Sequence, residues 1–213
     1  MILRGVRDRL RHTPAARTAR RWLSGVLPYR KMQGERLDAE YAAGKWDYLH
    51  GIGELARFSV LAGYCHHLKP GARILEVGCG EGILRERLDP GRYTSYVGID
   101  VSAGAVARAA ARKSGGKASF LRADAARWQT AERFDLVVFN ECLEYFDDPI
   151  GVVRRYESFL AGGGLFLVSM FDGVDTVRSR RIWKRLEMVY RVEDLTRVTN
   201  RARLSWTIEV LAP

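Results

Sequence analysis

The sequence predicts an α/β fold: a mostly parallel, seven-stranded sheet with helices on both faces, an antiparallel strand near the C-terminus and a helical N-terminal extension. From residue 72 onward, strand-length apolar segments alternate with segments of helical periodicity, as in repeated βα units. The segment Phe134–Asn140 is almost entirely apolar, as expected for a strand buried on both faces. The 213 residues, 47% of them hydrophobic, are enough for one well-filled core.

Each element is predicted from its apolar periodicity and from the residues that end it. Strands are expected at 73–79, 96–100, 118–124, 134–140 and 165–171. Helices are expected at 83–88, 103–113, 150–160 and 176–190. Ser114-Gly115-Gly116 is predicted to end the second helix, and the glycine run 162–164 is predicted to close the third. The last two segments, 194–199 and 205–211, are expected to pair as antiparallel strands.

Composition divides the chain into three predicted parts: a basic amphipathic helical arm (1–31), a helical lead-in or lid (32–69) and a ligand-binding domain (70–213). The formal net charge is +10, and the arm holds nine basic residues against the single acid Asp8, which gives it +8. Trp22 and the apolar stripe of the arm favour an anionic membrane surface as its partner. RNA and a simple solvated face are the alternatives.

The cysteines and the hydropathy restrict the class of protein. Cys65, Cys79 and Cys142 form no CxxC pair, which argues against a disulfide framework and against a zinc site. No run of eighteen apolar residues is present, so no membrane-spanning helix is expected. A reducing, cytoplasmic location is therefore predicted, with peripheral membrane attachment as an extension of the arm hypothesis. The sequence does not indicate an oligomeric state.

A glycine loop is the most informative local feature. The strand Ile74–Val77 runs into Gly78, Gly80 and Gly82, and a helix follows at once. Glycines permit a sharp turn and let a ligand approach bare backbone, and the helix start presents free N–H groups. The third glycine comes one residue too early for the dinucleotide pattern G-x-G-x-x-G. Glu76, in front of the loop, fits an ammonium or sulfonium group better than a pyrophosphate.

Two further acids are predicted to end the next two strands. Asp100 follows Tyr96–Ile99, where its carboxylate is suited to accept hydrogen bonds from ribose hydroxyls. Asp124 follows the third strand, where it is suited to accept from an adenine amino group. Because parallel strands bring their carboxyl ends to one edge, Glu76, Asp100 and Asp124 are expected to line the same crevice.

These segments resemble the ordered motifs of class I S-adenosylmethionine-dependent methyltransferases, in the group of ubiquinone-type O-methyltransferases and nodulation-type N-methyltransferases. The resemblance rests on E-V-G-C-G-E-G, G-I-D-V-S, R-A-D-A and F-D-L-V-V-F-N-E-C-L-E-Y-F-D-D-P, and covers about residues 70–171. It implies a Rossmann-like domain and S-adenosylmethionine as cofactor. It also implies these contacts: the methionine moiety at Glu76, Gly78, Cys79, Gly80 and Gly82, the ribose at Asp100 with Val101, the adenine at Asp124 and Ala125, and the methyl donor at Asn140.

The segment after the fourth strand holds the candidate catalytic residues, Glu141, Glu144 and Tyr145. Many relatives have a histidine where this chain has Tyr145, so a histidine base is not expected at that position. For Glu144 a solvated or capping role, and for Tyr145 packing against the cofactor or lead-in, are the alternatives. Asp147 and Asp148 suggest a metal site, but an acid before Pro149 is more simply a helix N-cap, and no metal is predicted.

The acceptor is predicted only by class. Tyr41, Trp46, Tyr48 and Arg57 are candidates for a lid, with core packing as the alternative, and the acceptor pocket is expected to draw on 32–67 and 172–191. Methyl transfer to an O or N atom of a small-molecule, glycan or lipid-linked acceptor is the predicted function. An RNA methyltransferase that uses the basic arm and a non-catalytic cofactor-binding partner protein are the alternatives. Against nucleic acid, the fourth strand lacks the [DN]-P-P-[YF] stack of amino-directed base methylases.

Overall fold

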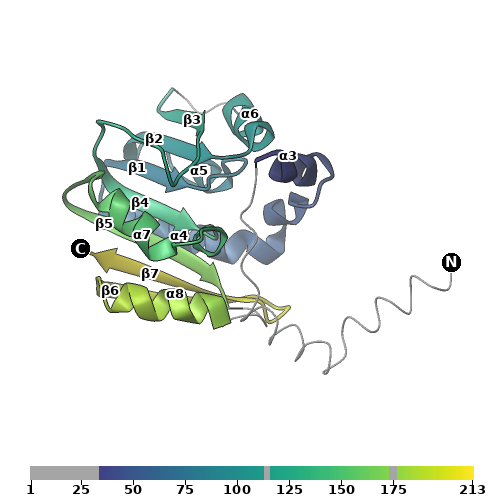
Figure 1. The fold of residues 1–213 in the computed structure, drawn as a ribbon. Helices are drawn as coiled ribbons and strands as arrows, with labels where there is room; N and C mark the ends of the chain where they lie inside the picture. Colours follow the sequence, from purple (N-terminus) through teal and green to yellow (C-terminus); the bar gives the residue numbers. More distant parts are fainter. Residues whose placement is uncertain (1–33, 113–115, 173–176) are drawn as a thin grey trace.

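In a computed structural model, the described residues are 34–112, 116–172 and 177–213. They form a seven-stranded sheet in the order β3-β2-β1-β4-β5-β7-β6 (Figure 1). The strands are β1 (Ala72–Val77), β2 (Tyr93–Asp100), β3 (Ala118–Arg122), β4 (Phe134–Asn140), β5 (Leu160–Phe171), β6 (Arg191–Thr199) and β7 (Ser205–Ala212). β7 is antiparallel to both of its neighbours, and the pairs from β3 through β5 are parallel. The predicted fold class is confirmed.

Helices cover both faces of this sheet. The α-helices are α3 (Gly34–Ala42), α4 (Ile52–Leu68), α5 (Ile83–Glu86), α6 (Ala103–Ala111), α7 (Pro149–Glu157) and α8 (Val177–Glu187). Two short 3₁₀ helices, η1 (Asp47–His50) and η2 (Leu143–Tyr145), complete the described elements. The described part of the lead-in consists of α3, η1 and α4, with interruptions at Gly44, which has φ 68°, and at Gly51.

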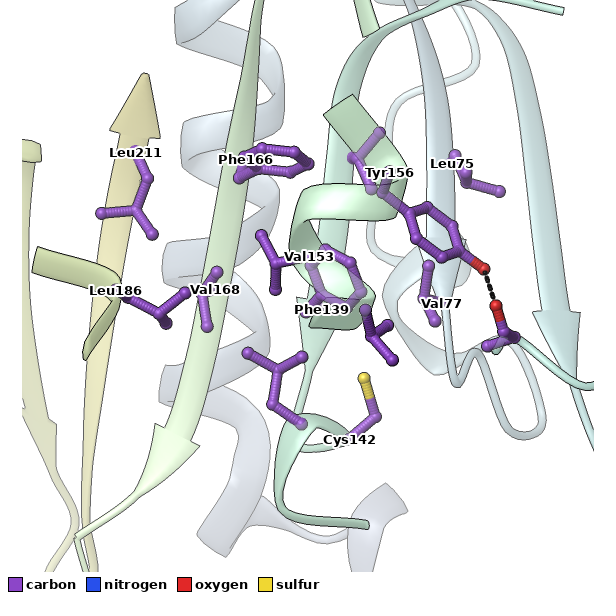
Figure 2. Close-up of a cluster of buried hydrophobic side chains, with 14 of the residues drawn as sticks. Leu75, Val77, Phe139, Cys142, Val153, Tyr156, Phe166, Val168, Leu186 and Leu211 are labelled. Carbon is purple, nitrogen blue, oxygen red and sulfur yellow. Dashed lines mark hydrogen bonds between the residues drawn. The ribbon is translucent and has the colours of Figure 1, made fainter. Parts of the chain in front are cut away.

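The core divides into two clusters, one on each face of the sheet. On one face, α7 and α8 pack onto β4 and β5 through Val153, Tyr156 and Leu186 (Figure 2). On the other face, α4 packs onto β1 and β4 through Phe58 and Leu61. Alternate residues of β1 and β4 enter opposite clusters, which explains why both strands are apolar along their length.

The prediction that the glycine run 162–164 closes a helix is wrong. The helix α7 ends at Glu157, and the glycines lie inside β5, which already begins at Leu160. The Phe159 carbonyl accepts a hydrogen bond from the Phe134 amide at 2.8 Å, so the chain joins the sheet directly after the helix. Pairing with β4 changes register between Phe134 and Leu136, and Gly163 there has φ 71°.

Other boundaries shift by a few residues. β2 begins three residues earlier than predicted, at Tyr93, and β3 ends at Arg122, two residues before Asp124. The predicted helix at 83–88 forms only Ile83–Glu86. The helical arm 1–31 lies outside the described residues, and the division into 1–31, 32–69 and 70–213 stays a prediction.

Candidate active site

A cavity of about 640 Å³ lies at the carboxyl ends of the central strands. It opens where β1 and β4 part, the point at which the strand order reverses and at which open α/β sheets bind ligands. Residues following β1, β2, β3 and β4 line one part of it, and residues of α3, η1 and α4 line another. All of the predicted cofactor residues except Gly82 are among its lining residues, as are the three predicted catalytic residues.

The glycine loop lies close to neighbouring chain segments. Gly78 has φ 73°, and a Cβ built there would lie 2.7 Å from the Cβ of Cys142. Gly80 has φ 50°, and its Cβ would lie 2.7 Å from the hydroxyl of Tyr41. Both positions therefore require a glycine.

Gly82 has a different role from the one predicted. It has φ 76° and is the N-cap of α5. A Cβ there would lie 3.1 Å from the ring of Phe120 and 3.2 Å from the Cβ of Ala109, on the side of the loop that faces the packed helix α6 and strand β3. Gly82 is not among the described residues that line the cavity. It shapes the turn into the helix rather than a ligand surface.

Asp100, the last residue of β2, connects the glycine loop to the segment after β2 by hydrogen bonds. Its Oδ2 accepts from the Gly80 amide at 2.9 Å, and its Oδ1 accepts from the Ser102 amide at 2.8 Å. Burial raises the pKa of this carboxyl against the effect of those amide hydrogen bonds. A carboxylate offers about four acceptor positions, so Asp100 keeps acceptor capacity for a ligand hydroxyl beside its hydrogen bonds from Gly80, Ser102 and Val101.

Glu76 is the most buried acid of the cofactor side, with 1% of its surface exposed. Its carboxyl accepts from the Tyr96 hydroxyl and, at 3.3 Å, from Nδ2 of Asn140. Burial raises the pKa of Glu76 to about 7, although these hydrogen bonds oppose the shift. A cationic group placed beside it in the cavity would favour its ionised form.

Asp124 and Ala125 follow β3, and Ala125 belongs to the same buried cluster as Leu143 of η2. Asp124 is half-buried, and its Oδ1 accepts from the Ala126 amide at 3.0 Å. The Ala125 carbonyl accepts from the Tyr156 hydroxyl at 3.0 Å, the bond that is drawn in Figure 2. This bond fixes the loop after β3 to helix α7, so its backbone is held in place where an adenine is predicted.

The three candidate catalytic residues come from the segment that follows β4 and all line the cavity. Glu141 follows β4 with φ 56°, and its Oε1 accepts from the Ser169 hydroxyl at 2.8 Å. Burial raises the pKa of Glu141. Glu144 and Tyr145 belong to η2, and burial together with the neighbouring Glu141 raises the pKa of Glu144 to about 7.

Arg57 does not belong to a lid. It is 1% exposed, and its Nε and Nη2 donate to Oε2 of Glu54 at 3.1 and 2.9 Å. Its Nη1 donates to Oδ1 of Asn140, and its guanidinium lies 4.2 Å from the ring centre of Phe58. Arg57 is therefore a buried part of the cavity wall, and Glu54 neutralises its charge inside the protein.

The other three residues of the predicted lid do share one wall of the cavity. The rings of Tyr41 and Trp46 have centroids 5.8 Å apart, and those of Trp46 and Tyr48 lie 6.3 Å apart. Asp38 fastens this segment to α6, because its Oδ1 accepts from the Ser102 hydroxyl at 2.5 Å and from the Gly104 amide at 2.9 Å.

The prediction for the C-terminal part of the acceptor pocket is wrong. None of the described residues in the predicted range 172–191 lines the cavity, and Phe171, Leu204 and Trp206 do so instead. β7 runs antiparallel beside β5, so Trp206 at its start pairs with Phe171 at the end of β5, with ring centroids 5.6 Å apart. Glu54 and Arg57 were detectable in principle, since an acid and a base three residues apart interrupt an otherwise apolar helix face.

The acids before α7 form a cap. The side chain of Asp148 accepts from the Gly151 amide at 3.1 Å, and Pro149 occupies the first turn, which confirms the N-cap interpretation. Across residues 34–112, 116–172 and 177–213, no group of three or more His, Cys, Asp or Glu side chains is placed to hold a metal ion. Within the same ranges, no helix is long and apolar enough to cross a membrane.

Comparison with known proteins identifies the family. A family model described as a methyltransferase domain matches residues 52–206, most of the chain. The chain belongs to the class I S-adenosylmethionine-dependent methyltransferases. The match begins at α4, so the family's domain includes the helix that carries Glu54 and Arg57.

Curated relatives are similar over part of their length. The trans-aconitate 2-methyltransferase of Streptomyces avermitilis is 32% identical over 131 residues, which are 58% of this chain and 47% of that protein. The ubiquinone biosynthesis O-methyltransferase of Aeromonas salmonicida is 34% identical over 106 residues, 48% of this chain and 44% of that one. The matches thus span about half the length of these relatives.

Solved methyltransferase structures share the fold. The N-methyltransferase NodS from Bradyrhizobium japonicum WM9, in complex with S-adenosyl-L-homocysteine, superposes with a TM-score of 0.66 at 22% identity, covering 78% of this chain and 90% of that chain. A methyltransferase complex with the Haloferax volcanii Trm112 methyltransferase activator gives a TM-score of 0.68 at 17% identity, covering 83% and 97%.

Proposed function

We propose that this chain binds S-adenosylmethionine in the cavity and transfers its methyl group to an O or N atom of a small-molecule, glycan or lipid-linked acceptor. One observation carries the proposal: Glu76, Asp100 and Asp124 lie at the carboxyl ends of three neighbouring strands and line one cavity beside a glycine loop. When bound, S-adenosylmethionine supplies an electrophilic methyl group on a sulfonium.

The residues of the cavity fit the parts of this cofactor. Gly78 and Gly80 leave bare backbone where an L side chain would clash, and the buried Glu76 is suited to the methionine ammonium. Asp100 has free lone pairs for the ribose hydroxyls, with Val101 beside it. Asp124 and the backbone of Ala125 are assigned to the adenine. Cys79 belongs to the loop assigned to the methionine moiety, and Asn140 is assigned to the methyl donor.

Catalysis is assigned to the side of the cavity formed by η2 and the end of β4. Holding the acceptor atom in line with the methyl group supplies about 7–11 kcal/mol of the barrier reduction without any proton transfer. Where the acceptor must lose a proton, Glu144 is the proposed base, since its pKa of about 7 leaves it half ionised at neutral pH. Glu141 and Tyr145 are proposed to orient the acceptor.

Calorimetric titration of the full chain with S-adenosylhomocysteine tests the cofactor site. Asp100→Asn keeps the size of the side chain while removing its charge, and we expect the dissociation constant to rise by about tenfold or more. Asp100→Ala should abolish measurable binding. Asp147→Ala is the matched control, because Asp147 is exposed and does not line the cavity. Unchanged affinity in both Asp100 variants, with circular dichroism showing folded protein, would refute the proposed site.

The partner of residues 1–31 and the location of the protein are also proposals. We propose that residues 1–31 attach the protein, otherwise cytoplasmic, to anionic membrane. Co-sedimentation with phosphatidylserine vesicles should need these residues and should weaken at high salt. Co-purification of nuclease-sensitive RNA would instead favour the alternative in which the arm binds nucleic acid.

A further inference from the structure

The charged residues on the cavity wall are strongly unbalanced. Among the described residues that line it, seven carry a carboxyl group and one carries a cation, Arg57. The acids are Glu54, Glu76, Glu81, Asp100, Asp124, Glu141 and Glu144. A wall of this composition repels an anionic acceptor and attracts a cationic one.

The single cation on the wall is not available to a ligand. Two nitrogens of Arg57 donate to Glu54 and the third to Asn140, so every guanidinium nitrogen is already engaged. Its guanidinium carbon also lies 4.2 Å from the ring centre of Phe58 and 5.7 Å from that of Trp206. A carboxylate acceptor would therefore meet Arg57 only by breaking a buried ion pair.

Most of the acids are already accounted for by the cofactor or by internal ion pairs. Glu81 points to Arg108 and Arg112, at 2.6 and 3.2 Å. Glu54 neutralises Arg57, and three acids are assigned to the cofactor. Glu141 and Glu144 are left on the acceptor side, where Arg57 acts on Glu141 but forms its close ion pair with Glu54.

The groups that face these two acids come from several elements. Glu144 is influenced by Glu141, by Asp172 after β5 and by Arg178 of α8, and Arg178 does not line the cavity. Glu141 is influenced by Arg57 and Glu54 of α4, and it accepts from Ser169 of β5. The sum of these charges near the acceptor side is negative.

Aromatic side chains surround the same side. Trp46 and Tyr48 come from the segment around η1, and Phe171 and Trp206 come from the end of β5 and the start of β7. Aromatic faces attract cations as well as apolar groups, and a combination of carboxylates and aromatic rings is suited to an ammonium on an apolar body.

We propose that the acceptor is a small molecule that presents an aliphatic amine on an apolar or aromatic body, with its ammonium held by Glu141 and Glu144. This inference rests on the proposed function and names its substrate class. The ammonium first gives a proton to Glu144. The free nitrogen lone pair then forms the new N–C bond while the C–S bond of the donor breaks, and the sulfur keeps that electron pair.

Binding of three matched probes to the full chain, saturated with S-adenosylhomocysteine, tests the substrate class. The probes are 2-phenylethylamine, 2-phenylethanol and 3-phenylpropanoate, and the fluorescence of Trp46 and Trp206 reports their binding. We expect the amine to bind at least about tenfold more tightly than the other two, as a charge-assisted hydrogen bond of 1.4 kcal/mol or more would give. Equal or tighter binding of the alcohol or the carboxylate overturns the inference, as does no amine binding at all.

Variants link this selectivity to the two acids. Glu141→Gln with Glu144→Gln should remove most of the preference for the amine, and Glu132→Gln, an exposed acid outside the cavity, should leave it unchanged. The rate of amine methylation should rise as the pH passes about 7, and Glu144→Gln should flatten that rise. A preference or a pH profile that survives in these variants overturns the inference. Failure of S-adenosylhomocysteine to bind would instead contradict the proposed function.

Discussion

The two sides of the cavity differ in how far apart their residues lie in the sequence. On the cofactor side, Glu76, Asp100 and Asp124 each lie within two residues of a strand end, and the glycines lie in the same short segment. On the acceptor side, Arg57, Ser169 and Trp206 come from distant parts of the chain and meet only because β7 and α4 pack against the central strands. The first side depends on local backbone geometry, and the second depends on buried charge and long-range packing.

Replacing Arg57, the buried cation of the cavity wall, should change the free energy of unfolding more than any of the substitutions that follow. Arg57→Met leaves Glu54 charged and buried without a partner, so we expect the free energy of unfolding to fall by about 3–5 kcal/mol. Urea denaturation followed by circular dichroism measures it. Adding Glu54→Gln should restore part of the loss, because no unpaired charge then remains. A loss below 1 kcal/mol in the single variant would contradict the account of the acceptor side.

A substitution in the glycine loop tests the local geometry of the cofactor side. Gly78→Ala must hold an L residue at φ 73° with its Cβ 2.7 Å from that of Cys142, so we expect a loss of about 2–3 kcal/mol in stability and weaker binding of S-adenosylhomocysteine. Gly162→Ala is the matched control, because a Cβ there meets nothing within 4 Å. The control should stay within about 0.5 kcal/mol. Equal behaviour of the two variants would show that the loop is not constrained as described.

Glu209 of β7 tests how burial alone, without a ligand nearby, changes a pKa and the stability that depends on it. It is 1% exposed and lies outside the cavity, no described residue hydrogen-bonds its Oε2, and burial raises its pKa to about 7. The folded state therefore holds the proton more tightly than the unfolded state, whose pKa is near 4.5, so the stability contribution of this group falls as the pH rises from 4.5 to 7.

Glu209→Gln should therefore raise the free energy of unfolding at pH 8 by about 1–3 kcal/mol and change it little at pH 4. Urea denaturation at both pH values checks the sign. Saturating S-adenosylhomocysteine should leave this difference unchanged, since Glu209 is outside the cavity. A larger gain at pH 4 than at pH 8 would be the opposite of the expected linkage.

The smallest effect is expected at the adenine end. Asp124 is half-buried, so Asp124→Asn should raise the dissociation constant of S-adenosylhomocysteine by only about 3–10-fold. Asp147→Asn serves as the control in the same calorimetric titration. A loss larger than that of Asp100→Asn would reverse the order of the two acids and would place the tighter hydrogen bond on the adenine.

The comparison also explains what could be predicted from the sequence. The strands and the cofactor acids follow from apolar periodicity and from motifs in which a strand end, a glycine and an acid are close in sequence. Gly82 was assigned to the ligand because the motif does not reveal on which side of the turn Phe120 packs. The glycines at 162–164 were mistaken for a helix end, because the pairing of Leu160 with Phe134 is not a local property. Trp206 was missed for the same reason, since only the antiparallel pairing of β7 brings it to the cavity.

One series of hydrogen bonds joins the two sides. Glu76 accepts from Asn140, Asn140 accepts from Arg57, and Arg57 is paired with Glu54. A positive group arriving beside Glu76 changes the charge at one end of this series, and the other end borders the acceptor. Coupling between two sites is reciprocal, so each ligand should alter the affinity of the other by the same factor. We therefore expect saturating S-adenosylhomocysteine to change the dissociation constant of the acceptor, and saturating acceptor to change that of S-adenosylhomocysteine by the same factor.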